Sequence, residues 1–371
     1  MGSDTTARTI KAPVRTASDL VAAGLIEPEH AAGISRVLDE FALAITPSVA
    51  ETIASADPSG GVARQFVPTL AEAVETADEL TDPIGDDAHS PIKGIVHRYP
   101  DRVLLKPVHV CPVYCRFCFR RERVGPGGEA LTQAELSAAL DYIRANPEIW
   151  EVILSGGDPL ILSPRRLADI RDSLEVIDHV RVVRIHSRVP VVDPVRVTQD
   201  LVQALRRPKP TYVVIHANHA DEFTGAARSA CARLADAGIP LLSQSVLLRG
   251  VNDEPEALAR LLRTFVENRI KPYYLHHCDL ARGTGHFRMS IAEGQELMRA
   301  LRGRISGLCQ PTYVLDIPGG HGKVPIGPSF LEAGGQDRLE VRDVSGIPHS
   351  YCEAEVRTDG QDRRRESTRR G

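Results

Sequence analysis

Long hydrophobic runs and a strong charge imbalance are both missing from this chain of 371 residues. No apolar run approaches the ~20 residues that a membrane-spanning helix needs, and the N-terminal stretch MGSDTTARTIKAP lacks the apolar core of a signal peptide. The net charge is -4, so composition gives no reason to expect nucleic acid or a membrane as a partner. These absences predict a globular protein of the cytoplasm.

Cysteine is scarce, and the odd total of seven does not suit a framework of disulfides. Three of them, Cys111, Cys115 and Cys118, lie within eight residues in the run HVCPVYCRFCFRR, at C-x3-C-x2-C spacing. Thiolates this close together suit an iron–sulfur cube or zinc. No fourth Cys or His follows at the spacing of a zinc ribbon or zinc finger, which disfavours structural zinc. A cube held by three cysteines keeps one iron open to a substrate or cofactor.

From residue 103 onward, β-rich runs alternate with amphipathic helical patterns. The runs are VLLKPVHV, VILSGG, VRVVRIHS, YVVIHAN, LLSQSVLL, KPYYLHH and TYVLDIP. This alternation predicts an α/β fold with parallel strands joined by right-handed crossovers. Seven candidate strands favour a partial barrel over a full barrel of eight, with the active site at the carboxyl ends of the strands. Polar residues fall at those ends: Ser155, Asp158, His186, His216, Gln244, Asp279 and Asp316.

The two ends of the chain differ from this alternating region. Residues 1–90 show helical spacing of apolar side chains, with a cap expected at Ser18 and Asp19 and loop signals at 58–61 and 81–91. We predict a helical N-terminal extension over 1–90 that covers the barrel, a barrel over 91–330 and a short C-terminal segment over 331–371. The last stretch, RTDGQDRRRESTRRG, is charged and has no apolar side chain to bury, which predicts a solvated, disordered end.

The sequence around the cysteines resembles the radical S-adenosylmethionine enzymes, and more closely the lysine 2,3-aminomutases. HRYPDRVLL, CPVYCRFCFRR, LSGGDPL, QSVLLRGVND, CDLARGTGHFR and DIPGGHGK follow one another in that family's order, over roughly residues 91–330. The resemblance implies a [4Fe–4S] cluster on Cys111, Cys115 and Cys118, together with S-adenosylmethionine and pyridoxal 5′-phosphate. It also implies an electron donor such as flavodoxin or ferredoxin.

Cofactor contacts are implied by the same resemblance. For S-adenosylmethionine they are a glycine turn and two later strand ends: Ser155, Gly156, Gly157, Asp158, His216 and Gln244. Taken alone, such residues are more often an ordinary turn and satisfied polar side chains. For pyridoxal phosphate the contacts are Arg98, Tyr99 and Arg102 in HRYPDR, where guanidinium groups suit phosphate oxygens.

Lys323 follows the glycines of DIPGGHGKVPIG. The run does not match a nucleotide-binding P-loop, because Val324 follows the lysine and Ile317 occupies the position of the first glycine. A flexible loop suits a lysine that must form a Schiff base and later release it. By resemblance, Lys323 is the lysine that binds pyridoxal phosphate covalently, and we expect it to be catalytic.

Asp279 and Asp316 each end a predicted strand, and two carboxylates in one cavity repel unless a cation joins them. By resemblance they bind the side-chain ammonium of lysine, while Arg120 binds its α-carboxylate. The implied reaction moves the amino group of L-lysine from C2 to C3. Arginine, ornithine or a modified lysine would fit the same carboxylates, whereas glutamate is disfavoured by repulsion. A non-catalytic protein with structural zinc is the alternative from another class.

The chain departs from the family pattern at two positions. Glu254 stands where aminomutases with longer tails have a cysteine of an intersubunit zinc site, and the tail has only Cys352. We therefore expect no such zinc, and the formation of a homo-oligomer stays open. His276 replaces a tyrosine that lies close to the cofactors in the family, so we expect different packing there.

Overall fold

The computed structural model describes residues 12–55, 60–333 and 338–352. The chain forms two compact units, divided between Gly327 and Pro328. The N-terminal helices belong to the same unit as the barrel. Within the described ranges, no helix combines the length and the apolar character needed to cross a membrane.

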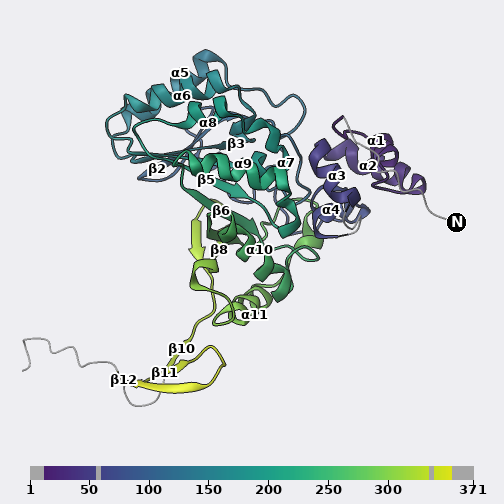
Figure 1. Cartoon of the computed structure of the whole chain (residues 1–371), viewed down its shortest axis with the longest axis vertical. Coiled ribbons are helices and arrows are strands. Elements are labelled where there is room, and N and C mark those ends of the chain that lie inside the picture. Colours follow the sequence, from purple (N-terminus) through teal and green to yellow (C-terminus); the bar gives the residue numbers. More distant parts are fainter. Residues whose placement is uncertain (1–11, 56–59, 334–337, 353–371) are drawn as a thin grey trace, which may run out of the picture. The chain divides into compact units, whose positions relative to one another are not determined.

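Nine strands of the first unit form one sheet in which sequence neighbours are also spatial neighbours (Figure 1). The edge strands β1 (Ile95–Tyr99) and β9 (Gly322–Pro325) pair antiparallel and were not predicted as strands. A partial barrel, rather than a full barrel of eight, is thereby confirmed. The seven central strands are parallel and coincide with the seven β-rich runs: β2 (Arg102–Val108), β3 (Glu151–Gly156), β4 (Val182–Ser187), β5 (Thr211–His216), β6 (Leu241–Val246), β7 (Ile270–His276) and β8 (Thr312–Ile317).

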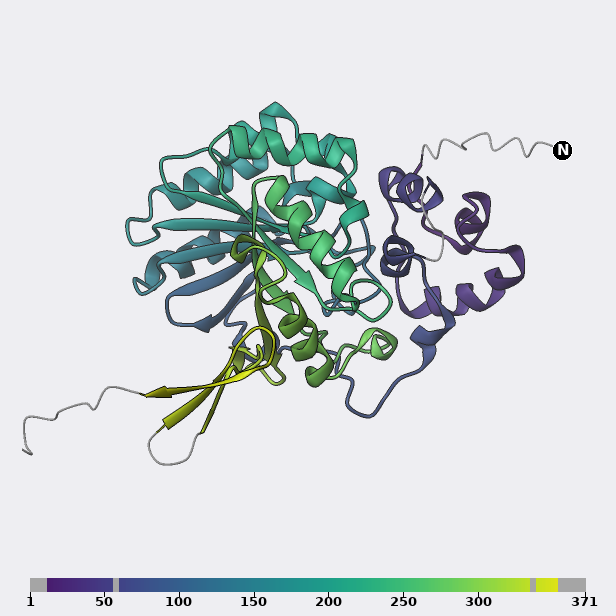
Figure 2. The same cartoon turned by 60° about the horizontal axis from the view of Figure 1, so that its bottom comes forward.

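Helices between the parallel strands lie on the outer face of the curved sheet (Figure 2). Several begin at a Ser or Thr whose side-chain oxygen accepts a backbone N–H of the first turn, as at Thr132, Ser163 and Thr224. Each such cap stabilises its helix by about 1 kcal/mol. The helices are α5 (Gln133–Ala145), α6 (Pro164–Glu175), α7 (Val189–Val192), α8 (Gln199–Leu205), α9 (Gly225–Asp236), α10 (Pro255–Glu267) and α11 (Ile291–Leu301).

Four helices precede the barrel, as the apolar spacing predicted: α1 (Ala17–Ala22), α2 (Ala31–Glu40), α3 (Pro47–Ser55) and α4 (Gly61–Phe66). The cap predicted at Ser18 and Asp19 was misplaced, because Thr16 is the N-cap and Asp19 completes its capping box. Leu20 and Phe66 are fully buried in the same apolar cluster as the barrel residues Leu154 and Ile185. The extension therefore shares one hydrophobic core with the barrel.

The acidic loop over 81–91 was expected to mark a boundary, and it packs instead against the turn between β8 and β9. Gly85 has φ +67°, and a Cβ on it would lie 2.4 Å from the backbone N of Gly320, so only glycine allows this approach. The His89 ring contacts the carbonyl of Gly320 at 3.0 Å. This loop thereby brings Ile84 and Asp86 to the wall of the central cavity.

The second unit contains a three-stranded antiparallel sheet that the sequence pattern did not predict. Its strands are β10 (Leu331–Ala333), β11 (Arg338–Arg342) and β12 (Pro348–Cys352). An ion pair between Arg342 and Glu332, at 2.9 Å, links the first two strands. The end predicted to be disordered, residues 357–371, lies outside the described residues.

Candidate active site

A cavity of about 930 Å³ runs through the barrel and includes the carboxyl ends of its strands. This volume is that of a site for small molecules and cofactors. All the residues expected to serve the site line this one cavity: Arg98, Tyr99, Arg102, Cys111, Cys115, Cys118, Arg120, Ser155, Gly156, Gly157, Asp158, His216, Gln244, Asp279, Asp316 and Lys323. The fold thus brings together residues separated by more than two hundred positions.

The three cysteines lie in a loop after β2. Burial raises the pKa of Cys118 to about 11 and raises that of Cys111 well above its ordinary value, while at Cys115 the Arg188 guanidinium opposes the effect of burial. Thiols with raised pKa values lose their protons when a metal binds them. Across the described residues, no three His, Cys, Asp or Glu side chains gather around one point as a single ion requires. In a cube each thiolate binds a different iron, so a cluster on this loop does not need its three sulfur atoms around one point.

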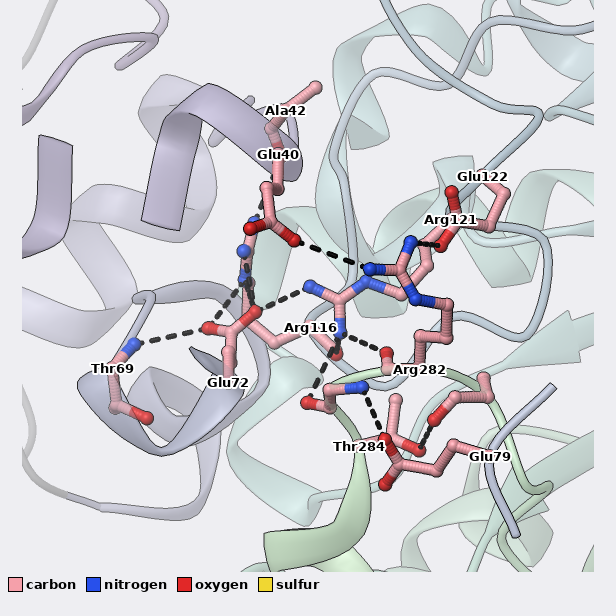
Figure 3. A network of polar contacts seen from close by, with 12 residues as sticks. Glu40, Ala42, Thr69, Glu72, Glu79, Arg116, Arg121, Glu122, Arg282 and Thr284 are labelled. Carbon is pink, nitrogen blue, oxygen red and sulfur yellow. Dashed lines mark hydrogen bonds and ion pairs between the residues drawn. The ribbon is translucent and has the colours of Figure 1, made fainter. Parts of the chain in front are cut away.

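A buried ion pair holds this loop from the N-terminal side (Figure 3). Arg116, between the second and third cysteines, donates from Nε and Nη2 to the carboxylate of Glu72 at 2.6–3.0 Å. Arg121 also pairs with Glu72 and donates to the carbonyl of Arg282 at 3.1 Å. Burial opposes ionisation of Glu72, yet the two arginines keep its pKa below the ordinary value. Sequence analysis missed Glu72, because nothing in its 3-10 turn, Leu70–Ala73, indicated chemistry.

The glycine turn after β3 packs closely on the strand that leads to the cysteines. Gly156 has φ +102°, and a Cβ on Gly157 would lie 2.2 Å from the carbonyl oxygen of Val110. The Asp158 carboxylate accepts four hydrogen bonds: from the backbone N–H groups of Leu160, Arg188 and Val189 and from the Ser187 hydroxyl. A carboxylate has about four acceptor positions, so this one is saturated within the protein.

His216 and Gln244 are register partners across β5 and β6. Burial, with Arg188 nearby, lowers the pKa of His216 well below the ordinary value, so its imidazole is neutral. Its Nε2 is buried without a hydrogen-bond partner among the described residues. Since His216 lines the cavity, a buried ring nitrogen without a partner at this place fits the polar part of a bound ligand.

Lys323 lies on β9 rather than in the glycine loop where the sequence placed it. Its backbone N–H donates to the Tyr99 hydroxyl at 2.8 Å, which joins the two edge strands. Arg102 stacks on the Tyr99 ring, 3.9 Å from the centroid. Arg98 donates to the carbonyl of Ile84 at 2.6 Å, and its Nε is buried without a partner among the described residues. This free donor fits the anionic group of a cofactor.

The Lys323 ammonium pairs with the Asp316 carboxylate, and the Nδ1 of His276 lies 3.2 Å from both groups. Burial opposes ionisation of Asp316, but His276 and Lys323 outweigh it and lower the pKa of the carboxyl. Asp279 behaves differently, because burial and repulsion from Asp316 raise its pKa to about 7. Asp279 and Asp316 thus share the cavity. Among the described residues, Asp316 forms an ion pair with Lys323, whereas Asp279 forms none.

Asp86 is a cavity residue that sequence analysis missed. It pairs with Arg120 at 2.9 Å and with Arg98 at 3.3 Å, and it is 4% exposed. Arg120 also donates to the Ser155 hydroxyl at 3.4 Å. Little in the sequence indicated that Asp86 is buried. Only Ile84 and Gly85, which precede it in an otherwise acidic loop, differ from an exposed polar segment. Asp86 fixes two arginines whose guanidinium groups face the cavity.

Comparisons with known proteins identify the family of this chain. A family model described as "Radical SAM superfamily" matches residues 105–262, and one described as "Lysine-2,3-aminomutase" matches residues 298–367. The L-lysine 2,3-aminomutase of Clostridium subterminale is 42% identical over 325 residues, which cover 88% of this chain and 78% of that protein. The glutamate 2,3-aminomutase of Clostridioides difficile is 35% identical over 90% of this chain and 78% of that protein.

A solved structure of Streptococcus suis SuiB, bound to its precursor peptide SuiA, is similar at a TM-score of 0.44 and 15% identity, covering 59% of this chain and 49% of that one. A likeness at this level carries no argument about function. The relatives of high identity are isomerases, which removes the alternative of a non-catalytic zinc protein. The chain therefore belongs to the lysine 2,3-aminomutase family of radical S-adenosylmethionine enzymes, and it is an isomerase.

Proposed function

We propose that this enzyme moves the amino group of L-lysine, or of a similar basic amino acid, from C2 to C3. One observation carries the substrate class: Asp279 and Asp316 share the cavity, and Lys323, a cation of the protein, pairs with Asp316 there. A buried pair of carboxylates binds a cation strongly and repels an anion. The side-chain ammonium of lysine supplies that cation.

We assign the cluster to Cys111, Cys115 and Cys118. These three residues would hold the cluster, which together with S-adenosylmethionine would supply the radical chemistry that starts the reaction. The neutral imidazole of His216, with its unpartnered Nε2, and the neighbouring Gln244 are assigned to the same cofactor.

We assign the glycine turn to S-adenosylmethionine through Ser155, Gly156 and Gly157, with Asp158 in a positioning role. Since the Asp158 carboxylate is saturated by four donors of the protein, it fixes the turn rather than offering an acceptor to the cofactor. The Ser155 hydroxyl has no such saturation, and it lies beside Arg120 in the cavity.

Pyridoxal phosphate supplies the covalent attachment and electron delocalisation that allow the nitrogen to migrate. We assign it to Lys323, Tyr99, Arg98 and Arg102. The orphaned Nε of Arg98 and the exposed edge of Arg102 suit phosphate oxygens. Tyr99 accepts a hydrogen bond from the backbone N–H of Lys323 and so fixes the position of this residue on β9.

The remaining polar groups orient the substrate. Arg120 is assigned to the α-carboxylate, and Asp86 holds its guanidinium in place before substrate arrives. Arg120 on the α-carboxylate and the two carboxylates on the side-chain ammonium would fix both charged ends of the substrate. The apolar and aromatic wall, including Phe117 and Tyr274, excludes water from the reacting atoms.

Substrate identity is tested by anaerobic incubation of the reconstituted enzyme with a panel of amino acids, followed by mass spectrometry of the products. We expect β-lysine from lysine and little conversion of glutamate. Preferred turnover of arginine, ornithine or a modified lysine would keep the chemistry and change the substrate. Preferred turnover of glutamate would contradict the assignment of Asp279 and Asp316.

A further inference from the structure

Arg188 follows β4, and its guanidinium is buried behind the cysteine loop. Its Nη1 donates to the Sγ of Cys115 at 2.8 Å. Its Nη2 donates to the Glu222 carboxylate at 2.7 Å and to the side-chain oxygen of Gln65. Within the described residues, no guanidinium donates to the sulfur atom of either of the other two cysteines, although the backbone N–H of Arg120 donates to that of Cys118. Arg188 therefore distinguishes one thiol from the other two.

The position of Arg188 is fixed from three sides. Its backbone N–H donates to the Asp158 carboxylate at 2.7 Å, next to the glycine turn. Its guanidinium lies over the ring of Phe66, 4.5 Å from the centroid, and 5.5 Å from that of Phe117. The side chain is 6% exposed. A guanidinium held in this way cannot turn away when the charge on the sulfur changes.

The partner carboxylate lies on the far side of the guanidinium. Glu222 is 3% exposed and accepts from the backbone N–H groups of Asn218, at 2.7 Å, and His219, at 2.9 Å. Gln65 bridges the group by donating to Glu222 at 3.1 Å. The buried cation thus touches the sulfur directly, whereas the buried anion is one contact further away. The net effect at the sulfur is that of a positive charge in a medium of low dielectric constant.

Reduction of the cluster adds one electron from a low-potential donor protein and takes the cube from the 2+ to the 1+ state. Hydrogen bonds to ligand sulfur and nearby positive charge stabilise the more negative, reduced state. We propose that Arg188 raises the reduction potential of the cluster through its bond to Cys115, and that Glu222 limits the size of this effect. This inference rests on the proposed cluster. The N-terminal helix α4, through Gln65, then takes part in setting the potential.

The test is a potentiometric titration of the anaerobically reconstituted full-length protein, followed by the electron paramagnetic resonance signal of the reduced cluster. At a fixed potential, Arg188→Met should lower the ratio of reduced to oxidised cluster at least tenfold. A tenfold change corresponds to a reduction potential lower by about 59 mV for a one-electron couple. Glu222→Gln keeps the cation and weakens its counter-charge, so it should move the potential in the opposite direction. A purely structural role would not produce shifts of opposite sign.

Two further variants keep the test decisive. Arg188→Met combined with Glu222→Gln leaves no lone buried charge, and it serves if the single Arg188 variant fails to retain iron. Arg184→Met is the matched control, because Arg184 is a cavity arginine on β4 paired with Glu151 at 2.9 Å. We expect the double variant to have a lowered potential and the control to have the potential of the parent.

Each failure has a distinct meaning. If variants that carry a full cluster, including Glu222→Gln, titrate at the potential of the parent, the inference about Arg188 is overturned and the proposed function stands. If the parent protein itself binds no iron and sulfide, the proposed cluster is wrong, and the inference falls with it.

Discussion

Lys323 is the register partner of Asp316 across β8 and β9, and its ammonium forms an ion pair with the Asp316 carboxylate. The same carboxylate is assigned to the ammonium of the substrate, so the two cations compete for one anion. Any state in which Lys323 gives up its positive charge leaves Asp316 available to the substrate. The hairpin thereby couples Lys323 to the proposed binding of a basic side chain.

Lys323→Ala should abolish the attachment of pyridoxal phosphate that borohydride fixes, while the iron content stays that of the parent. Lys323→Arg keeps a cation opposite Asp316 without a reactive amine, so it should lose the attachment and retain the fold. Mass-spectrometric mapping of the fixed cofactor is the measurement. Lys271, which donates to two backbone carbonyls far from the cavity, is the control, and Lys271→Ala should keep the adduct. Mapping of the cofactor to another lysine would refute the assignment.

Asp279→Asn should lower kcat/KM for lysine by roughly ten- to a hundredfold, because one charge-assisted contact contributes about 1.5–3 kcal/mol. Cleavage of S-adenosylmethionine without productive substrate should remain, since Asp279 is not assigned to that cofactor. Asp316→Asn is a less clean variant, because Asp316 also pairs with Lys323. The measurement is steady-state kinetics with lysine, together with product analysis. If Asp279→Asn has the kcat/KM of the parent, the Asp279 carboxylate does not bind the substrate ammonium.

The pH dependence of substrate binding should report on Asp279. Burial and repulsion from Asp316 raise its pKa to about 7. Below that pH the carboxyl is mostly neutral and offers no charge to the ammonium, so KM for lysine should rise as the pH falls through about 7. Asp279→Asn removes this titration, and its KM should be high and flat over the same range. A parent enzyme with a flat KM profile there would contradict the expectation.

Replacement of Cys111, Cys115 or Cys118 by Ala should remove most of the iron and abolish reductive cleavage of S-adenosylmethionine. In the proposed cluster each thiolate would hold a different iron, so loss of one ligand should disrupt assembly. Iron and sulfide analysis with the visible spectrum is the measurement. Cys231→Ala is the control, because that thiol is buried in α9 away from the loop. Full iron and activity in any one cluster variant would exclude that residue as a ligand.

Glu72→Gln should lower the free energy of unfolding by about 3–5 kcal/mol, because it leaves Arg116 buried without its anion. The cysteine loop should also lose iron faster to a chelator. Glu75→Gln breaks a more exposed ion pair, with Arg282, and should change stability by only about 0–1 kcal/mol. Denaturant unfolding of both variants gives the comparison, and equal effects would mean that the buried pair does not hold the loop.

The hydrophobic pattern predicted all seven parallel strands, because each contains a short β-rich run whose apolar residues are buried in the core. The edge strands β1 and β9 escaped prediction because they are short and polar, and their pairing depends on a neighbour. The three strands after Gly327 escaped for the same reason. Lys323 was consequently assigned to a flexible loop, whereas pairing with β8 holds it in a strand.

The sequence by itself determined the spacing of the cysteines, the order of the strands and the family, since these are properties of adjacent residues. Only the tertiary structure decided which charges meet. Glu72 reaches Arg116 across 44 positions, and Gln65 reaches Arg188 across 123. Acidic and amide residues in polar loops have no periodic signature, and whether they are exposed or buried depends on how the loops fold over the barrel. In a buried place of low dielectric constant such pairs become strong, so the helices that were expected only to cover the barrel also hold the cysteine loop.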